Sequence, residues 1–197
     1  MTETTPELPN PWMPNMAQMG MIALLASLII FFIGLAIAYW IIIGDKELAG
    51  KINVPLSLWI STVVIIASGA TMILARFYLR RGRIVLYRQW VMATTAFGVL
   101  FLLSQAWAWR DLAGQGVMMA ANPRGSAFYV FSGLHGAHLL GGLGGLAYLV
   151  LKTRNLGSDE EQPLRQSRKN AQITAWYWNF IVISWLGLFA VLLNWAG

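Results

Sequence analysis

The stretch from Met19 to Ile43 reads MGMIALLASLIIFFIGLAIAYWIII and contains no Asp, Glu, Lys or Arg. About 20 consecutive apolar residues are enough for an α-helix to cross the hydrocarbon layer of a bilayer. Because backbone groups inside lipid find no water to bind, a span of this kind must be helical. This stretch therefore predicts a transmembrane helix.

Four further stretches have the same character, and charged residues make up only 11% of the chain. An average soluble domain carries about 25%. We predict an all-α integral membrane bundle of five helices, forming one domain over residues 16–197. The predicted spans cover approximately residues 19–43, 55–79, 89–109, 126–151 and 171–195. Residues 1–15 contain four prolines and are predicted to form an extended tail, because proline disfavours helix.

Basic residues are distributed unequally between the two ends of the predicted helices. One end carries ten Lys and Arg residues and the other carries four. The positive-inside rule then predicts a cytoplasmic N-terminus and an external C-terminus. Half of the ten lie in the link between the second and third spans, where we expect them to orient the protein and contact anionic lipid headgroups. These five are Arg76, Arg80, Arg81, Arg83 and Arg88. Since no folded soluble module accompanies the cluster, we expect no nucleic-acid partner.

The fourth span carries two overlapping patterns. Gly133, Ala137, Gly141 and Gly145 recur every four residues, which is typical of a surface where another membrane helix approaches closely. Polar side chains also lie in the spans, and such groups inside a membrane need hydrogen-bond partners. We predict a structural polar network formed by Gln105, His135, His138 and Asn179.

The chain has two histidines and no cysteine, and its predicted spans contain no carboxylate. A transition-metal or haem site needs more ligands than this, on facing helices. We therefore expect no catalytic residue, no metal and no haem on this chain. The fifth span holds several tryptophans, and Trp176, Trp178 and Trp195 lie near its ends. These three are predicted to form part of an aromatic belt at the membrane surfaces.

Five segments, in order, resemble subunit III of the haem–copper oxidases, the cytochrome c and quinol oxidases. The most specific is Phe131-Ser-Gly-Leu-His135-Gly-Ala-His138, which is similar to a Gly-x-His-Gly-x-His signature of that family. The other segments are Ala26–Gly34, Trp59–Thr71, Gly98–Trp109 and Trp176–Trp185. The five-helix count is similar to that of the shorter bacterial members.

The resemblance implies a non-catalytic subunit of an aerobic terminal oxidase in a bacterial plasma membrane. It implies partner subunits I and II, which hold the haems and copper, reduce oxygen and pump protons, and it implies bound phospholipid. Four titratable groups that are usual in the family are missing here. Leu28, Ala108 and Val182 stand in place of carboxylates, and Asn179 stands in place of a histidine.

Three alternative functions remain open at this point. One is an accessory protein of nitric oxide reductase, because a group of such proteins also resembles subunit III. Another is a small transporter or channel, which would need charged groups or broken helices at mid-membrane. The last is a self-contained haem protein, which would need ligands on facing helices.

Overall fold

The computed structural model describes residues 16–42, 54–116, 123–153 and 161–196. Within these ranges the chain forms five long helices and no strand, which confirms the predicted all-α bundle of apolar helices. The helices are α1 (Met16–Ile42), α2 (Leu56–Arg80), α3 (Ile84–Gly114), α4 (Pro123–Thr153) and α5 (Glu161–Ala196). The Pro-rich tail lies outside the described residues.

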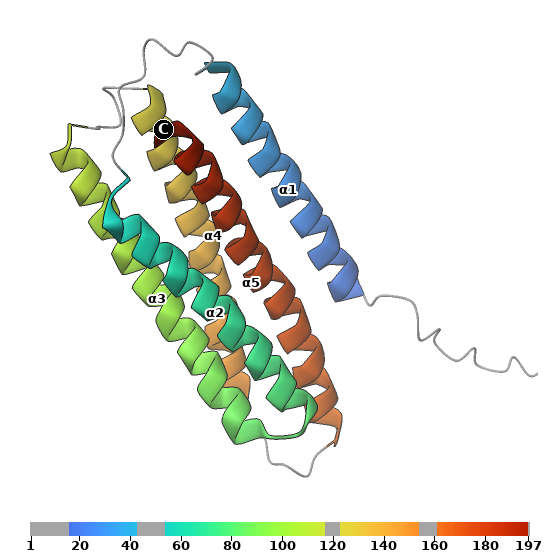
Figure 1. Ribbon diagram of the computed structural model, residues 1–197. Coiled ribbons are helices and arrows are strands. Elements are labelled where there is room, and N and C mark those ends of the chain that lie inside the picture. The colour runs from blue at the N-terminus through green and yellow to red at the C-terminus, as the bar shows by residue number, and fades with distance from the viewer. Residues whose placement is uncertain (1–15, 43–53, 117–122, 154–160, 197) are drawn as a thin grey trace, which may run out of the picture.

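Helices α2 to α5 form an antiparallel four-helix bundle in which consecutive helices alternate in direction (Figure 1). The turn between α2 and α3 is short. It closes because Gly82 adopts a φ of +73°, a conformation that side chains with a Cβ disfavour, and because the Arg83 N–H donates to the Tyr78 carbonyl. Gly116, with a φ of +79°, ends α3 in the same way.

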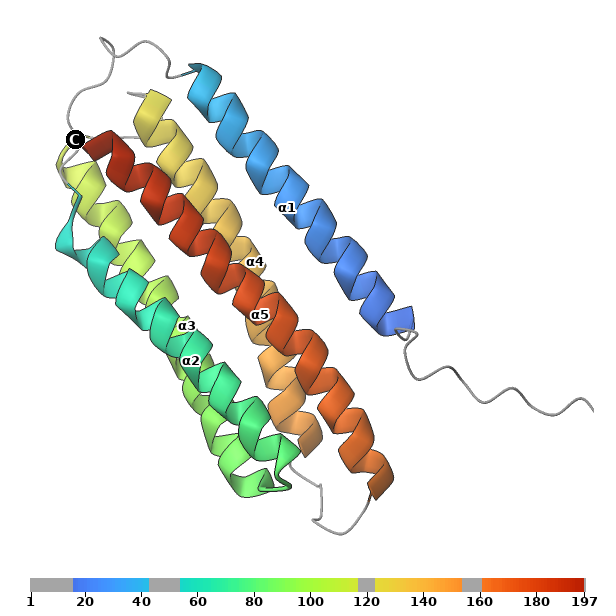
Figure 2. The ribbon, with the colours of Figure 1, turned by 45° about the vertical axis from the view of Figure 1, so that its right-hand side comes forward.

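Helix α1 stands apart from the other four (Figure 2). Only 6% of the residues in its apolar stretch are buried, against 50% of those in the apolar stretch of α2. Phe32 is the one buried side chain of α1 among those that the structure describes. Its ring lies 5.5 Å from the His138 ring of α4 and 6.4 Å from the Phe180 ring of α5. An apolar helix with so little internal contact presents most of its surface to lipid or to a neighbouring protein.

Candidate functional site

Hydrogen bonds join different helices in the interior of the four-helix bundle, and Trp178 of α5 lies at the centre of this interior. The indole is fully buried, and its Nε1–H donates to Ser68 Oγ of α2 at 3.1 Å. Ser68 in turn donates to the Thr94 carbonyl of α3, and Thr94 Oγ1 lies 2.9 Å from Thr71 Oγ1. One polar chain therefore joins α5, α2 and α3 in an apolar core.

The same indole separates two glycines on different helices. A Cβ added to Gly98 of α3 would lie 2.8 Å from Trp178 Cη2, and one added to Gly142 of α4 would lie 3.0 Å from Trp178 Cζ3. Carbon atoms in contact normally lie about 3.5–4.0 Å apart. Both positions therefore require glycine, and Trp178 packs directly against the backbones of α3 and α4.

The small residues that recur every four positions in α4 are packed less closely than Gly142. Cβ atoms added to Gly133, Gly141 and Gly145 would lie 3.7, 3.4 and 3.4 Å from the nearest neighbouring atoms, in contact but without a severe clash. Ala137 is exposed. Among the described glycines of α4, Gly142 makes the closest approach, to Trp178 and Ile181.

The position of Trp178 differs from the one expected from the sequence. It was predicted to lie at a membrane surface, but it is fully buried in the core, so the prediction is wrong for this residue. Trp176, one turn before Phe180, is half-buried, and the side chain of Trp195 lies outside the described residues. A signal was present in the sequence: Trp178 and Trp185 are seven residues apart, a spacing that places both on one helical face.

Trp185 forms a second connection of the same kind, nearer the C-terminal end of α5. Its Nε1–H donates to Thr62 Oγ1 of α2 at 3.1 Å. At the same end of the bundle Trp109 of α3 donates to Ser132 of α4 at 3.0 Å. Tryptophan N–H groups thus link neighbouring helices at several levels, which agrees with the need to satisfy every polar group inside a membrane.

The two histidines of α4 have different surroundings. His135 is 1% exposed, and its ring lies 5.6 Å from the Phe101 ring and 5.3 Å from the Trp185 ring, inside the bundle. Its Nδ1 lies 3.5 Å from Ser184 Oγ. His138 lies on the side facing α1, where its Nδ1 is 2.7 Å from the Leu134 carbonyl. The two imidazoles therefore do not converge on one point.

The predicted polar network is not directly connected. Among the residues that the structure describes, no hydrogen bond joins any two of Gln105, His135, His138 and Asn179, and neither amide atom of Gln105 has a partner. Asn179 is half-buried beside Trp178. A network that joins these four residues through other partners stays a prediction, while the observed hydrogen bonds between helices include those of serine, tryptophan and tyrosine side chains.

Within the described residues, no three His, Cys, Asp or Glu side chains come together. Asp111 of α3 accepts a hydrogen bond from Ser57 of α2 at 3.1 Å. The hydrogen bonds of the bundle interior hold the helices in register.

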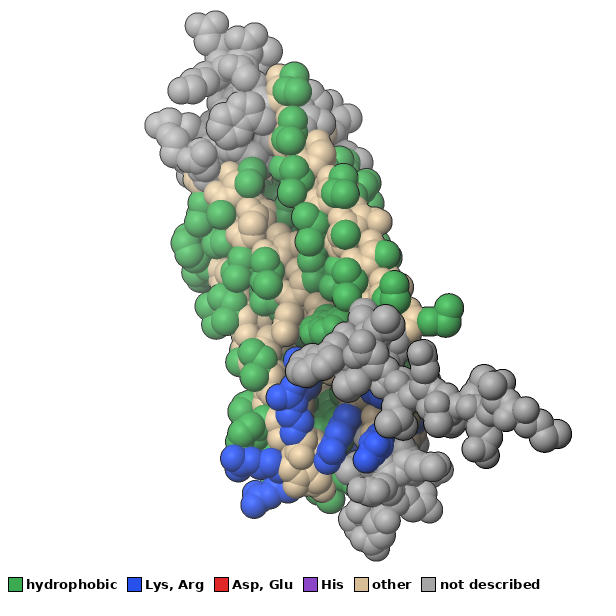
Figure 3. Space-filling view, turned by 90° about the vertical axis from the view of Figure 1, so that its right-hand side faces the viewer, with side chains coloured by type: hydrophobic (Ala, Val, Ile, Leu, Met, Phe, Trp, Pro, Cys, Tyr) green, Lys and Arg blue, Asp and Glu red, His purple; other side chains and the backbone are tan. Residues whose placement is uncertain are grey.

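Basic side chains gather at the end of the bundle that contains the turn between α2 and α3 (Figure 3). Arg80, Arg81 and Arg83 are exposed there, and the Arg81 guanidinium lies 4.0 Å above the Phe77 ring. Arg88 instead turns inward and donates to the Thr153 carbonyl in the last turn of α4. A cation at a helix C-terminus complements the negative end of the helix dipole.

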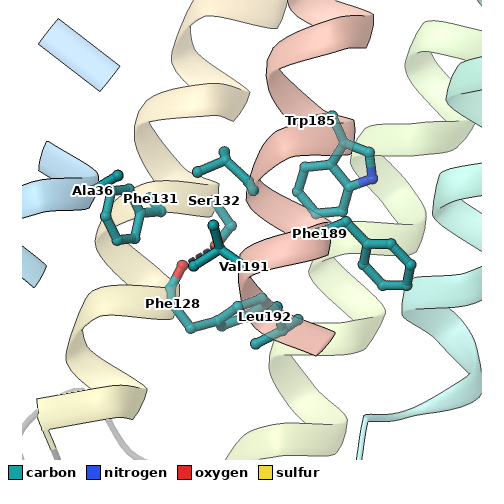
Figure 4. A pocket seen from close by; sticks show the side chains of 9 residues that line it. Ala36, Phe128, Phe131, Ser132, Trp185, Phe189, Val191 and Leu192 are labelled. Atoms are coloured by element: carbon teal, nitrogen blue, oxygen red, sulfur yellow. Dashed lines mark hydrogen bonds between the residues drawn. The ribbon is translucent and has the colours of Figure 1, made fainter. Parts of the chain in front are cut away.

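A small cavity of about 30 Å³ lies between α1, α4 and α5 (Figure 4). Its walls are almost wholly apolar. They include Ala36 of α1, Phe131 of α4 and Leu192 of α5. A cavity lined this way tends to stay free of water and can accept an apolar group.

Comparison with known proteins decides the family. A family model described as cytochrome c oxidase subunit III matches residues 12–197. The chain belongs to this family. It is similar to cytochrome c oxidase subunit 3 of Corynebacterium diphtheriae, with 33% identity over 89% of this chain and 86% of the relative.

Other relatives of this subunit III chain carry the same name. A probable cytochrome c oxidase subunit 3 from Nocardia farcinica is 30% identical over 91% of this chain and 88% of its own length. One from Mycobacterium tuberculosis is 32% identical over the same shares. The resemblance stated from the sequence is confirmed, and nothing in these comparisons favours a nitric oxide reductase accessory protein. The protein is therefore a subunit III of a haem–copper oxidase, and such a subunit belongs to a multisubunit complex.

Proposed function

We propose that this chain is the non-catalytic subunit III that stabilises the oxygen-reducing subunit of its oxidase, with subunits I and II as its partners. The observation that carries the proposal is that polar groups in the bundle interior form hydrogen bonds between helices. The Trp178 indole of α5 donates to the Ser68 hydroxyl of α2, and Ser68 donates to the Thr94 backbone carbonyl of α3, so these bonds join three helices. Hydrogen bonds of this kind hold a scaffold together. Haem and copper are expected in the partner subunits and not on this chain.

The exposed helix α1 supports an assembly role. Phe32 is its one buried side chain among those described, and the rest of its described surface is mostly apolar. Part of that surface is available to another membrane subunit or to phospholipid. Bound phospholipid is expected beside the exposed arginines at the basic end, because anionic headgroups are attracted to such clusters.

The membrane and orientation belong to the same proposal. The bundle has five helices long and apolar enough to span a bilayer, and several of its relatives come from bacteria. We place it in a bacterial plasma membrane with the basic end, and hence the N-terminus, on the cytoplasmic side. A reporter fused after Gly197 should then be active only outside the cytoplasm, and a cytoplasmic signal would contradict the orientation.

The test of the function is to tag the full chain, solubilise native membranes in mild detergent and identify the proteins that remain bound. We expect the catalytic oxidase subunit and subunit II in fixed ratio. Recovery with a nitric oxide reductase subunit, or recovery of the chain alone from membranes that contain the intact oxidase, would refute the proposal.

A further inference from the structure

Gln105 of α3 and His135 of α4 lie in the same layer of the bundle. Gln105 is four residues after Phe101 and four before Trp109, so all three share one helical face. The Phe101 ring contacts the His135 ring at 5.6 Å, and Trp109 donates to Ser132, three residues before His135. Gln105 thus lies between two contacts with α4, at the level of His135 along the bundle.

Both side chains are buried, with exposed fractions of 6% for Gln105 and 1% for His135. Within the described part of the chain, three of their polar atoms have no hydrogen-bond partner: Gln105 Oε1, Gln105 Nε2 and His135 Nε2. Leaving a buried polar atom unpaired costs about 1–3 kcal/mol. Three such atoms at one level of a membrane bundle favour a shared partner.

The nearby hydroxyl protons are already engaged in each helix's own backbone. Ser61 donates to the Ser57 carbonyl, and Thr62 donates to the Leu58 carbonyl. Ser104, Ser132 and Ser184 donate in the same way to the carbonyls of Phe101, Phe128 and Ile181. None of these five hydroxyls has a second proton to give.

The indole protons of this layer are engaged too, since Trp109 donates to Ser132 and Trp185 donates to Thr62. Because Ser184 gives its proton to the Ile181 carbonyl, its contact with His135 Nδ1 requires the proton to be on that ring nitrogen. His135 Nε2 is then an acceptor, as Gln105 Oε1 is. The layer therefore holds two unpaired acceptors, and the unpaired donor beside them is the Gln105 amide nitrogen, which cannot bond to its own Oε1.

We propose that the bundle holds at least one buried water molecule between Gln105 and His135. A water has two protons, one for Gln105 Oε1 and one for His135 Nε2, and it can accept from the Gln105 amide. Buried waters typically make about three such bonds. The water would complete the connection between α3 and α4 at the level where no direct side-chain bond joins Gln105 to α4.

The chain's two histidines make the proposal measurable. The full chain is labelled with ¹⁵N-histidine and reconstituted in lipid bilayers, and transfer of magnetisation from water protons to the ring nitrogens is recorded by solid-state NMR. His135→Phe assigns the two rings. We expect a proton on His135 Nδ1, none on Nε2, and transfer from a long-lived water to Nε2.

Gln105→Met should abolish most of that transfer, because the water loses one of its two anchoring side chains. Gln89→Met makes the same chemical change at an exposed position of α3 and should leave the transfer unchanged. Absence of water transfer in the unmodified chain, or a direct bond from the Gln105 amide to Nε2, would overturn the proposal. Equal transfer in Gln105→Met and the unmodified chain would overturn it as well. The measurement on the unmodified chain decides the matter even where a variant fails to fold.

Discussion

Gly142→Ala tests whether Trp178 is packed as tightly as the structure indicates. The added Cβ would lie 2.9 Å from Ile181 Cδ1 and 3.0 Å from both Trp178 Cε3 and Cζ3. The indole cannot easily retreat, because Gly98 lies close to its far edge and Ser68 holds its N–H. Overpacking of this kind costs about 1–3 kcal/mol.

The matched control is Gly144→Ala on the same helix. A Cβ at Gly144 would meet no atom within 4 Å. Both variants gain the same helix propensity, about 0.5–1 kcal/mol in water. The difference between them therefore isolates the packing term: Gly142→Ala should be less stable than Gly144→Ala by about 1–3 kcal/mol.

The assay is equilibrium unfolding of the full chain in mixed micelles titrated with a denaturing detergent and followed by far-ultraviolet circular dichroism. A difference of about 1.4 kcal/mol corresponds to a tenfold change in the unfolding constant. Equal midpoints for Gly142→Ala and Gly144→Ala would refute the close packing of α4 on Trp178.

Three further predictions concern single contacts. Trp185→Phe should destabilise the chain by about 1–2 kcal/mol in the same titration, because Thr62 loses its donor and the core loses ring volume; an unchanged midpoint would contradict this role. Phe32→Ala should make α1 more accessible to a membrane-embedded crosslinker, whereas Ile30→Ala, at a 71% exposed position, should not. Arg88→Leu should lower the thermal midpoint, because the last turn of α4 loses its cationic donor, and a midpoint equal to that of the unmodified chain would count against that contact.

Hydrophobicity determined what could be predicted best. A run such as Met19–Ile43 has one stable arrangement in lipid, so helix number and class follow from the sequence. Hydrophobicity does not, however, reveal how the helices pack against one another. Helix α1 and helix α2 are both strongly apolar, yet α2 lies inside the bundle and α1 stands apart. Apolar composition does not distinguish a helix that faces lipid from one that faces protein.

For a similar reason, the residues that form the core could not be assigned from the sequence alone. Four glycines fall between residues 141 and 145, and spacing favours Gly141 and Gly145. In the structure it is Gly142 that faces the large side chains of Trp178 and Ile181 on α5, and spacing within α4 does not show which face meets them. Trp178 was assigned to the membrane surface because it lies near the start of the predicted span. However, its side chain points into the bundle and bonds to Ser68 of α2, and position along the span does not reveal that direction.

Under the proposed function, this chain supports an oxidase without holding a redox centre. The most direct measurement is the visible absorption spectrum and metal content of the full chain after it has been separated from its purified complex. We expect no Soret band and no stoichiometric iron or copper on the chain, with haem and oxygen consumption retained by the remaining subunits. A Soret band or a stoichiometric metal on the separated chain would contradict the account.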